Sequence, residues 1–137
     1  MAAFSRTGEH AACWIGIGLA GAALQPERRG EWLRGVVAVI DAYALNYAIK
    51  LAVRRPRPDF SDLPALTPTV SRLSFPSAHA TTSFAAARAY HRLLSERALY
   101  AVAVGFALSR PYLGVHYPGD VVAGAIIGTA VGSMFNR

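Results

Sequence analysis

Residues 108–120, which read Leu-Ser-Arg-Pro-Tyr-Leu-Gly-Val-His-Tyr-Pro-Gly-Asp, separate two apolar runs and decide how the rest of the chain is interpreted. Pro118 suits the first position of a helix, because no amide N–H is needed there. A helix from Pro118 puts Asp120 in its first turn, where the helix dipole favours an acid. His116 then lies one turn earlier, so the carboxylate can hold one ring nitrogen while Arg110 holds an anion beside the other. The alternative is a polar loop between two helices with a solvated histidine.

The composition of the 137-residue chain indicates one integral-membrane domain, residues 1–137, without repeats. Hydrophobic residues make up 53% and charged residues 16%, against about 25% charged in soluble domains. Fourteen Lys and Arg against eight Asp and Glu leave a net charge of +6. The basic residues lie between apolar stretches rather than along one polar helix face, which argues against a nucleic-acid partner. Cys13 has no partner for an internal disulfide and is expected to be buried.

Five apolar segments predict an all-α bundle of about five transmembrane helices. They are residues 11–24, 35–53, 78–94, 98–108 and 121–135. Residues 25–34 are expected to form a polar, basic turn, and residues 54–76 the longest loop, since five prolines interrupt it. A cleavable signal peptide is the alternative for the first segment, but the further apolar spans disfavour it.

Small and polar residues inside these segments predict how the helices pack. Gly124, Gly128 and Gly132 recur every four residues, a spacing that allows close helix packing in lipid. Asp41 lies deep in the second segment and is expected to contact another helix.

Alternation of the five spans gathers the unusual polar residues on one membrane face. That face holds Lys50, residues 54–76, 77–79 and 110–120; the other holds residues 25–34, 88–97 and the C-terminus. Apart from candidate ligands, four arginines lie on the first face and seven on the second. The positive-inside rule therefore places the polar site on the extracytoplasmic face of a bacterial plasma membrane.

The polar groups of that face form three clusters in the sequence. Lys50 and Arg57 belong to the first, Ser77 and His79 to the second, and residues 108–120 are the third. Ser77 is a good N-cap, and the helix behind it offers backbone N–H groups to an anion. Together these residues suggest a phosphate pocket with a nucleophile and an acid. They imply no cofactor and no metal, since Asp59 and Asp62 are too isolated to form a metal site.

These clusters resemble the motifs of the phosphatidic acid phosphatase type 2 superfamily, which includes vanadium haloperoxidases and bacterial acid phosphatases. Its Lys-x6-Arg-Pro motif is similar to Lys50 through Arg57-Pro58. Its Pro-Ser-Gly-His motif is similar to residues 76–79, and its Ser-Arg-x5-His-x3-Asp motif to residues 109–120. The resemblance covers residues 50–120, and the surrounding helices fit the membrane branch.

The resemblance implies a role for each matched residue. His116 would attack phosphorus to form a phosphohistidine, with Asp120 orienting its ring. His79 would protonate the leaving oxygen and then activate water. The residues implied to bind the phosphoryl oxygens are Lys50, Arg57 and Arg110, with Ser77 and the N–H groups of Ala78 and His79. For Arg54 and Arg55 the preferred interpretation is interfacial snorkelling without a catalytic role.

The chain departs from the family pattern at two points. Ala78 stands where the motif has Gly, which keeps the N–H and adds a methyl group. Membrane members typically have six spans, against the five predicted here. This difference leaves open where the lipid enters and whether the chain forms a homo-oligomer.

The small size and residues 75–84 resemble actinobacterial members that dephosphorylate decaprenyl-phosphoryl phosphoribose. This resemblance implies a lipid phosphate as substrate and the bilayer as surroundings. The alternatives are a polyprenyl diphosphate phosphatase and a phosphatidic acid or phosphatidylglycerophosphate phosphatase. A non-catalytic protein that binds anionic lipid head groups is a further alternative, but it would not need His79, His116 and Asp120 together.

Overall fold

The computed structural model describes residues 11–58 and 71–136. Arg6, Asp59, Asp62 and Arg137 lie outside the described residues. The elements are α2 (Ala12–Leu24), a 3₁₀ turn η2 (Pro26–Arg28), α3 (Arg29–Val53), α4 (Ala78–Tyr90), α5 (Glu96–Tyr112) and α6 (Pro118–Met134). The described part of the chain contains no β-strand, which confirms the predicted all-α bundle.

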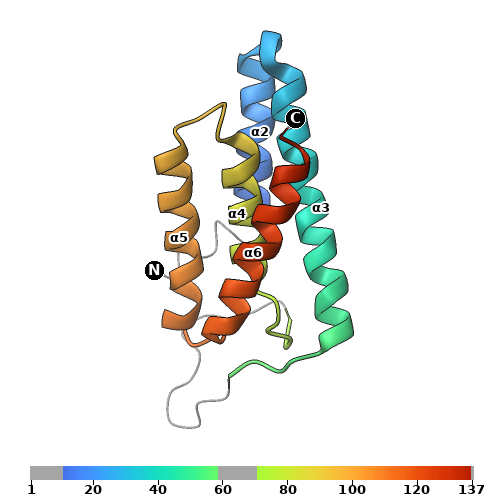
Figure 1. Ribbon diagram of the computed structural model, residues 1–137, viewed down its shortest axis with the longest axis vertical. Helices are drawn as coiled ribbons and strands as arrows, with labels where there is room; N and C mark the ends of the chain where they lie inside the picture. Colours follow the sequence, from blue (N-terminus) through green and yellow to red (C-terminus); the bar gives the residue numbers. More distant parts are fainter. Residues whose placement is uncertain (1–10, 59–70, 137) are drawn as a thin grey trace.

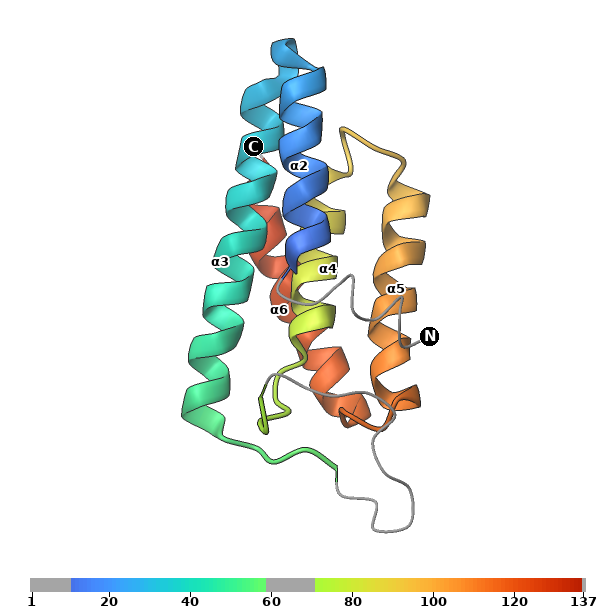
Figure 2. The ribbon, with the colours of Figure 1, turned by 180° about the vertical axis from the view of Figure 1, so that it is seen from behind.

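Helix α4 runs through the middle of the bundle and contacts the other four α-helices (Figure 1 and Figure 2). Its small side chains permit this position, since Ala80, Ala85, Ala86 and Ala87 are fully buried. The four outer helices carry exposed large apolar side chains, whereas α4, within the described residues, carries none. Large apolar side chains on the outside and a central helix of mostly small side chains suit a helix bundle that packs closely in lipid.

Within the described residues, one helix, Pro26–Val53, is long and apolar enough by itself to cross a membrane. Helices α2 and α6 are apolar but shorter. The sequence predicts a turn over residues 25–34. This prediction is wrong after Gln25, because residues 26–34 are helical. Pro26 occupies the first position of the helical turn, where proline is favoured, and Glu27 follows it, so the helix begins early.

The next two helices also differ from their predicted bounds. Helix α4 ends at Tyr90 rather than near residue 94. The Tyr90 carbonyl accepts from the N–H groups of Leu93 and Leu94, so the chain forms a tight turn after the helix. Helix α5 begins at Glu96, since the Ser95 side chain accepts from the Ala98 N–H at 3.4 Å.

The glycines of α6 pack directly on α4, as their spacing predicts. A Cβ atom on Gly124 would lie 2.7 Å from the Ser77 carbonyl oxygen, and one on Gly128 would overlap the Thr81 carbonyl. Backbone approach this close requires residues without a side chain.

The prediction that Asp41 contacts another helix is wrong. Asp41 lies on the exposed face of α3, one residue away from the buried Ala42. In the middle of α3 the buried polar residue is instead Asn46, whose Nδ2 donates to the Pro76 carbonyl at 3.2 Å and to Thr81 Oγ1 at 2.9 Å. Cys13, expected to be buried, is partly exposed and packs at the edge of the core.

Candidate active site

Four helix ends meet at one end of the bundle, the lower end in Figure 1. They are the C-terminal ends of α3 and α5 and the N-terminal ends of α4 and α6. All eight candidate residues lie on these ends or on the segments between them. The structure therefore brings the eight candidate residues, which lie between positions 50 and 120 of the sequence, to the same end of the bundle.

His116 and Asp120 face each other at the start of α6. His116 Nδ1 lies 3.6 Å from Asp120 Oδ2, and both side chains are buried. The same oxygen accepts from the backbone N–H of Tyr117 at 2.9 Å, and the Asp120 N–H donates to the Tyr117 carbonyl at 3.0 Å. This reciprocal capping fixes the carboxylate one turn from the histidine.

Arg57 approaches the other ring nitrogen of His116. Its Nη1 lies 3.2 Å from His116 Nε2 and donates to the Val115 carbonyl at 2.7 Å, while Nε donates to the Ser71 carbonyl at 2.7 Å. A guanidinium can only donate, so we assign Nε2 as unprotonated and the ring proton to Nδ1, which faces Asp120. The nitrogen with the free electron pair therefore points toward the cations.

Lys50 and Arg110 are cations buried beside this pair. Lys50 Nζ donates to the Pro76 carbonyl at 3.0 Å and to the Leu73 carbonyl at 3.3 Å. Arg110 is only 2% exposed, in the last turn of α5, and its carbonyl accepts from the Val115 N–H at 3.2 Å. Cations kept this dry are suited to hold an anion such as a phosphoryl group.

The N-terminus of α4 supplies the remaining candidates. Ser77 is its N-cap, and the Ser77 hydroxyl oxygen accepts from the Ala80 N–H at 3.5 Å. The Ser77 N–H donates to the Asp120 carbonyl at 3.0 Å, which ties the start of α4 to the start of α6. Ala78 and His79 occupy the first two helical positions, where N–H groups and the helix dipole favour an anion. The buried ring of His79 lies 6.4 Å from that of Phe106.

Residues 31–137 match the sequence model of the PAP2 superfamily. The chain belongs to this superfamily. It is 42% identical over 130 residues to a decaprenylphosphoryl-5-phosphoribose phosphatase of Mycobacterium tuberculosis, with 95% of this chain and 73% of that protein covered. It is 45% identical over 122 residues to the protein of the same name from Mycolicibacterium smegmatis, covering 89% of this chain and 68% of the relative.

A solved PAP2 structure has the same arrangement of helices. It is a transmembrane PAP2 type phosphatidylglycerolphosphate phosphatase from Bacillus subtilis, with a TM-score of 0.74 and 25% identity. The match covers 97% of this chain and 71% of that one. The described helices are thus a PAP2 transmembrane bundle.

Ala78, where the PAP2 motif has Gly, fits its place without backbone strain. The non-glycine residues with positive φ in the described ranges are Ala11 and Arg54. Since Ala78 is not among them, its backbone conformation is one that alanine adopts readily. The backbone at this position thus accommodates alanine as well as glycine.

One side chain of the candidate site was not predicted from the sequence. Arg55, interpreted as snorkelling, lies with Nη1 3.1 Å from Asp120 Oδ1. Its neighbour Arg54 behaves as that interpretation expects, being exposed and donating from Nε to the Leu51 carbonyl. The sequence offers no signal that separates the two arginines.

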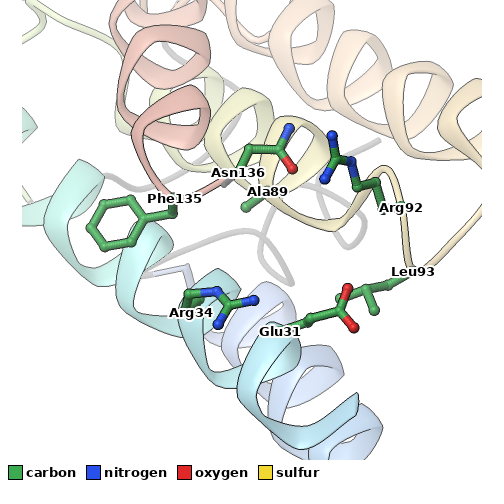
Figure 3. Close-up of a pocket in the computed structure, with 7 residues that line it drawn as sticks. All are labelled: Glu31, Arg34, Ala89, Arg92, Leu93, Phe135 and Asn136. Atoms are coloured by element: carbon green, nitrogen blue, oxygen red, sulfur yellow. The ribbon is translucent and has the colours of Figure 1, made fainter.

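A polar hollow lies at the opposite end of the PAP2 bundle. It has an empty volume of about 270 Å³ and is lined by Glu31, Arg34, Ala89, Arg92, Leu93, Phe135 and Asn136 (Figure 3). None of the candidate residues lines it. It is therefore separate from the candidate active site.

The surroundings of His116 predict how it titrates. Burial, and then the positive charges of Arg57, Arg110, Lys50 and His79, hold the pKa of His116 far below its usual range. Because a lowered pKa preserves the neutral imidazole in acid, His116 is expected to stay unprotonated at pH 5.5, where an ordinary histidine with a pKa of about 6.5 is mostly charged.

The ¹⁵N shifts of labelled histidine between pH 8 and pH 5 measure this directly. The His116→Gln variant identifies the signal, because it lacks that resonance alone. A His116 titration centred near pH 6.5 would contradict the expected lowering.

Proposed function

We propose that the chain is a membrane lipid phosphate phosphatase that removes a terminal phosphate from a polyprenyl-linked substrate such as decaprenylphosphoryl-5-phosphoribose. The observation that carries the proposal is the buried His116–Asp120 pair, with Arg57 3.2 Å from the unprotonated nitrogen. The 42% identity to a phosphatase named for that lipid, over 95% of this chain, supports the choice of substrate.

In the first step, His116 Nε2 attacks the terminal phosphorus and the bond from phosphorus to the substrate oxygen breaks. His79 donates a proton to that leaving oxygen, and Asp120 stabilises the charge that develops on the His116 ring through Nδ1. The product is a phosphohistidine and an alcohol on the lipid.

In the second step, His79 takes a proton from water, and the water oxygen attacks the phosphohistidine. The P–N bond breaks, and inorganic phosphate leaves with His116 neutral again. Lys50, Arg57 and Arg110 stabilise the phosphoryl oxygens in both steps, with the N-terminus of α4 behind them. We propose that these cations replace a metal ion in that role.

We also propose that the site faces the outside of the cell. The opposite end of the bundle carries most of the arginines that have no place in the site. These are Arg28, Arg29, Arg34, Arg88, Arg92 and Arg97. The positive-inside rule places such an end in the cytoplasm.

Phosphate release from three lipids tests the proposal. The purified protein in detergent with EDTA is given a polyprenyl-phosphoryl phosphoribose, a polyprenyl diphosphate and phosphatidic acid. EDTA-resistant release, fastest from the phosphoribose lipid, is the expected result.

The other outcomes each overturn a defined part of the proposal. Faster release from either of the other lipids overturns the proposed choice of substrate. Release that is abolished by EDTA overturns the metal-independent mechanism. Binding of all three lipids without release would show a non-catalytic anionic-lipid-binding protein.

A further inference from the structure

Arg55 lies between solvent and the buried carboxylate of Asp120. Its Nη1 donates to Asp120 Oδ1 at 3.1 Å, and its guanidinium carbon lies 4.2 Å from the centre of the Tyr117 ring. The Arg55 side chain is 43% exposed and that of Asp120 is 0% exposed. An ion pair with one fully buried partner is coupled much more strongly than an exposed pair.

The two oxygens of Asp120 therefore have different partners. Oδ2 faces His116 Nδ1 and accepts from the Tyr117 N–H, whereas Oδ1 accepts from Arg55. Rotation of the carboxylate would break both sets of contacts at once. Arg55 thus fixes the plane in which Oδ2 meets the histidine.

The backbone holds Arg55 in this position. Its carbonyl accepts from the Ser74 N–H at 2.8 Å, which joins the segment after α3 to the segment before α4. Stacking on Tyr117 restrains the guanidinium itself, and such cation–π contacts favour arginine over lysine. The side chain is held at both ends, as a positioning role requires.

We propose that Arg55 is a positioning residue for phosphoryl transfer, which holds Asp120 so that Oδ2 orients His116. The expected effect on kcat rests on the proposed function. The orientation of Asp120 by Arg55 does not depend on it. Residues that orient a metal ligand through a hydrogen bond typically contribute about 10- to 100-fold to activity. By analogy we expect a loss of that order in kcat when Arg55 no longer orients Asp120.

The test compares Arg55→Gln and Arg55→Lys with the matched control Arg54→Gln. Arg54 has the same side chain one position earlier, and it is exposed with no contact to the site. For Arg55→Gln we expect kcat to fall about 10- to 100-fold with KM changed less than about threefold. Arg55→Lys should restore part of the loss, because it returns the charge without the planar stacking.

The pH profile supplies a readout that a merely structural role would not move. The charged groups around His116 are Lys50 from α3, His79 from α4, Arg110 from α5, Asp120 from α6, and Arg57. Removing Arg55 takes one positive charge away from the His116–Asp120 pair, which favours the protonated imidazole. The acid limb of kcat/KM should therefore move to higher pH in Arg55→Gln and stay in place in Arg54→Gln.

The ¹⁵N shift of His116 separates this proposal from the phosphatase function, since it needs no turnover. A changed ¹⁵N shift of the His116 ring at pH 7 in Arg55→Gln, with no change in Arg54→Gln, supports the positioning role even if the wild type releases no phosphate from any lipid. An unchanged shift in Arg55→Gln overturns it. A rise in KM with kcat unchanged also overturns it, since Arg55 would then bind substrate directly.

Discussion

Replacing His116 with Ala is expected to abolish phosphate release, with a loss on the order of 10⁴-fold or more, as found when a catalytic nucleophile is deleted. The physical reason is that no other group of the site can take its place. Lys50, Arg57 and Arg110 are cations that bind oxygen rather than attack phosphorus. Asp120 is buried behind the ring of His116. The cations would still bind the substrate, so KM should change far less than kcat.

Trapping labelled phosphate on the protein measures the same step before turnover. Acid-labile, base-stable label is expected on the wild type after rapid quench and none on His116→Ala. His79→Ala should still become labelled, because His116 remains to attack phosphorus, but more slowly than the wild type, because the leaving oxygen has lost its proton donor. Its label should decay slowly, since the group that activates water is missing.

His91→Ala is the matched control for this experiment. His91 is partly buried, and it lies at the opposite end of the bundle, where its Nδ1 contacts the Arg88 carbonyl at 2.9 Å. Full activity and normal label are expected for this variant. Label that persists in His116→Ala would show that another residue carries the phosphoryl group.

The clustering of the motifs was predictable because helix alternation alone brings their residues to one end. Lys50 lies in the last turn of one helix, Ser77 caps the start of a second, and Pro118 begins a third, so an antiparallel path through the bundle brings them to the same end. Capping chemistry also fixed the start of α6 and the place of Asp120. Spacing and helix-end preferences are local information, which a sequence carries directly.

The role of Arg55 was not predictable because two adjacent arginines have the same chemistry. Helix α3 ends with Arg54 at a positive φ of 52°, and this left-handed residue turns the chain so that the next one faces Asp120. The same limit applies to Asp41 and Asn46. Which face of α3 is buried depends on where α4 lies, and no pattern within α3 states that.

Gly128→Ala is expected to damage both the fold and the site. A Cβ atom there would overlap the Thr81 carbonyl of α4 and lie 3.0 Å from the Ala85 backbone nitrogen. Since backbone atoms cannot rotate away, α6 has to move off α4, at a cost of roughly 1–3 kcal/mol in the free energy of unfolding. Thermal unfolding in detergent, followed by tryptophan fluorescence, measures this loss of stability.

Gly16→Ala is the matched control, because a Cβ atom on Gly16 of α2 would have no neighbour within 4 Å. Its stability should be equal to that of the wild type or slightly higher, since alanine favours the helix.

The activities of the two glycine variants should differ as well. Asp120 lies two turns before Gly128 on α6 and accepts from the Ser77 N–H, so displacing α6 separates the His116–Asp120 pair from His79 on α4. Gly128→Ala should therefore lose kcat as well as stability, whereas equal stability of the two variants would refute the close contact between α6 and α4.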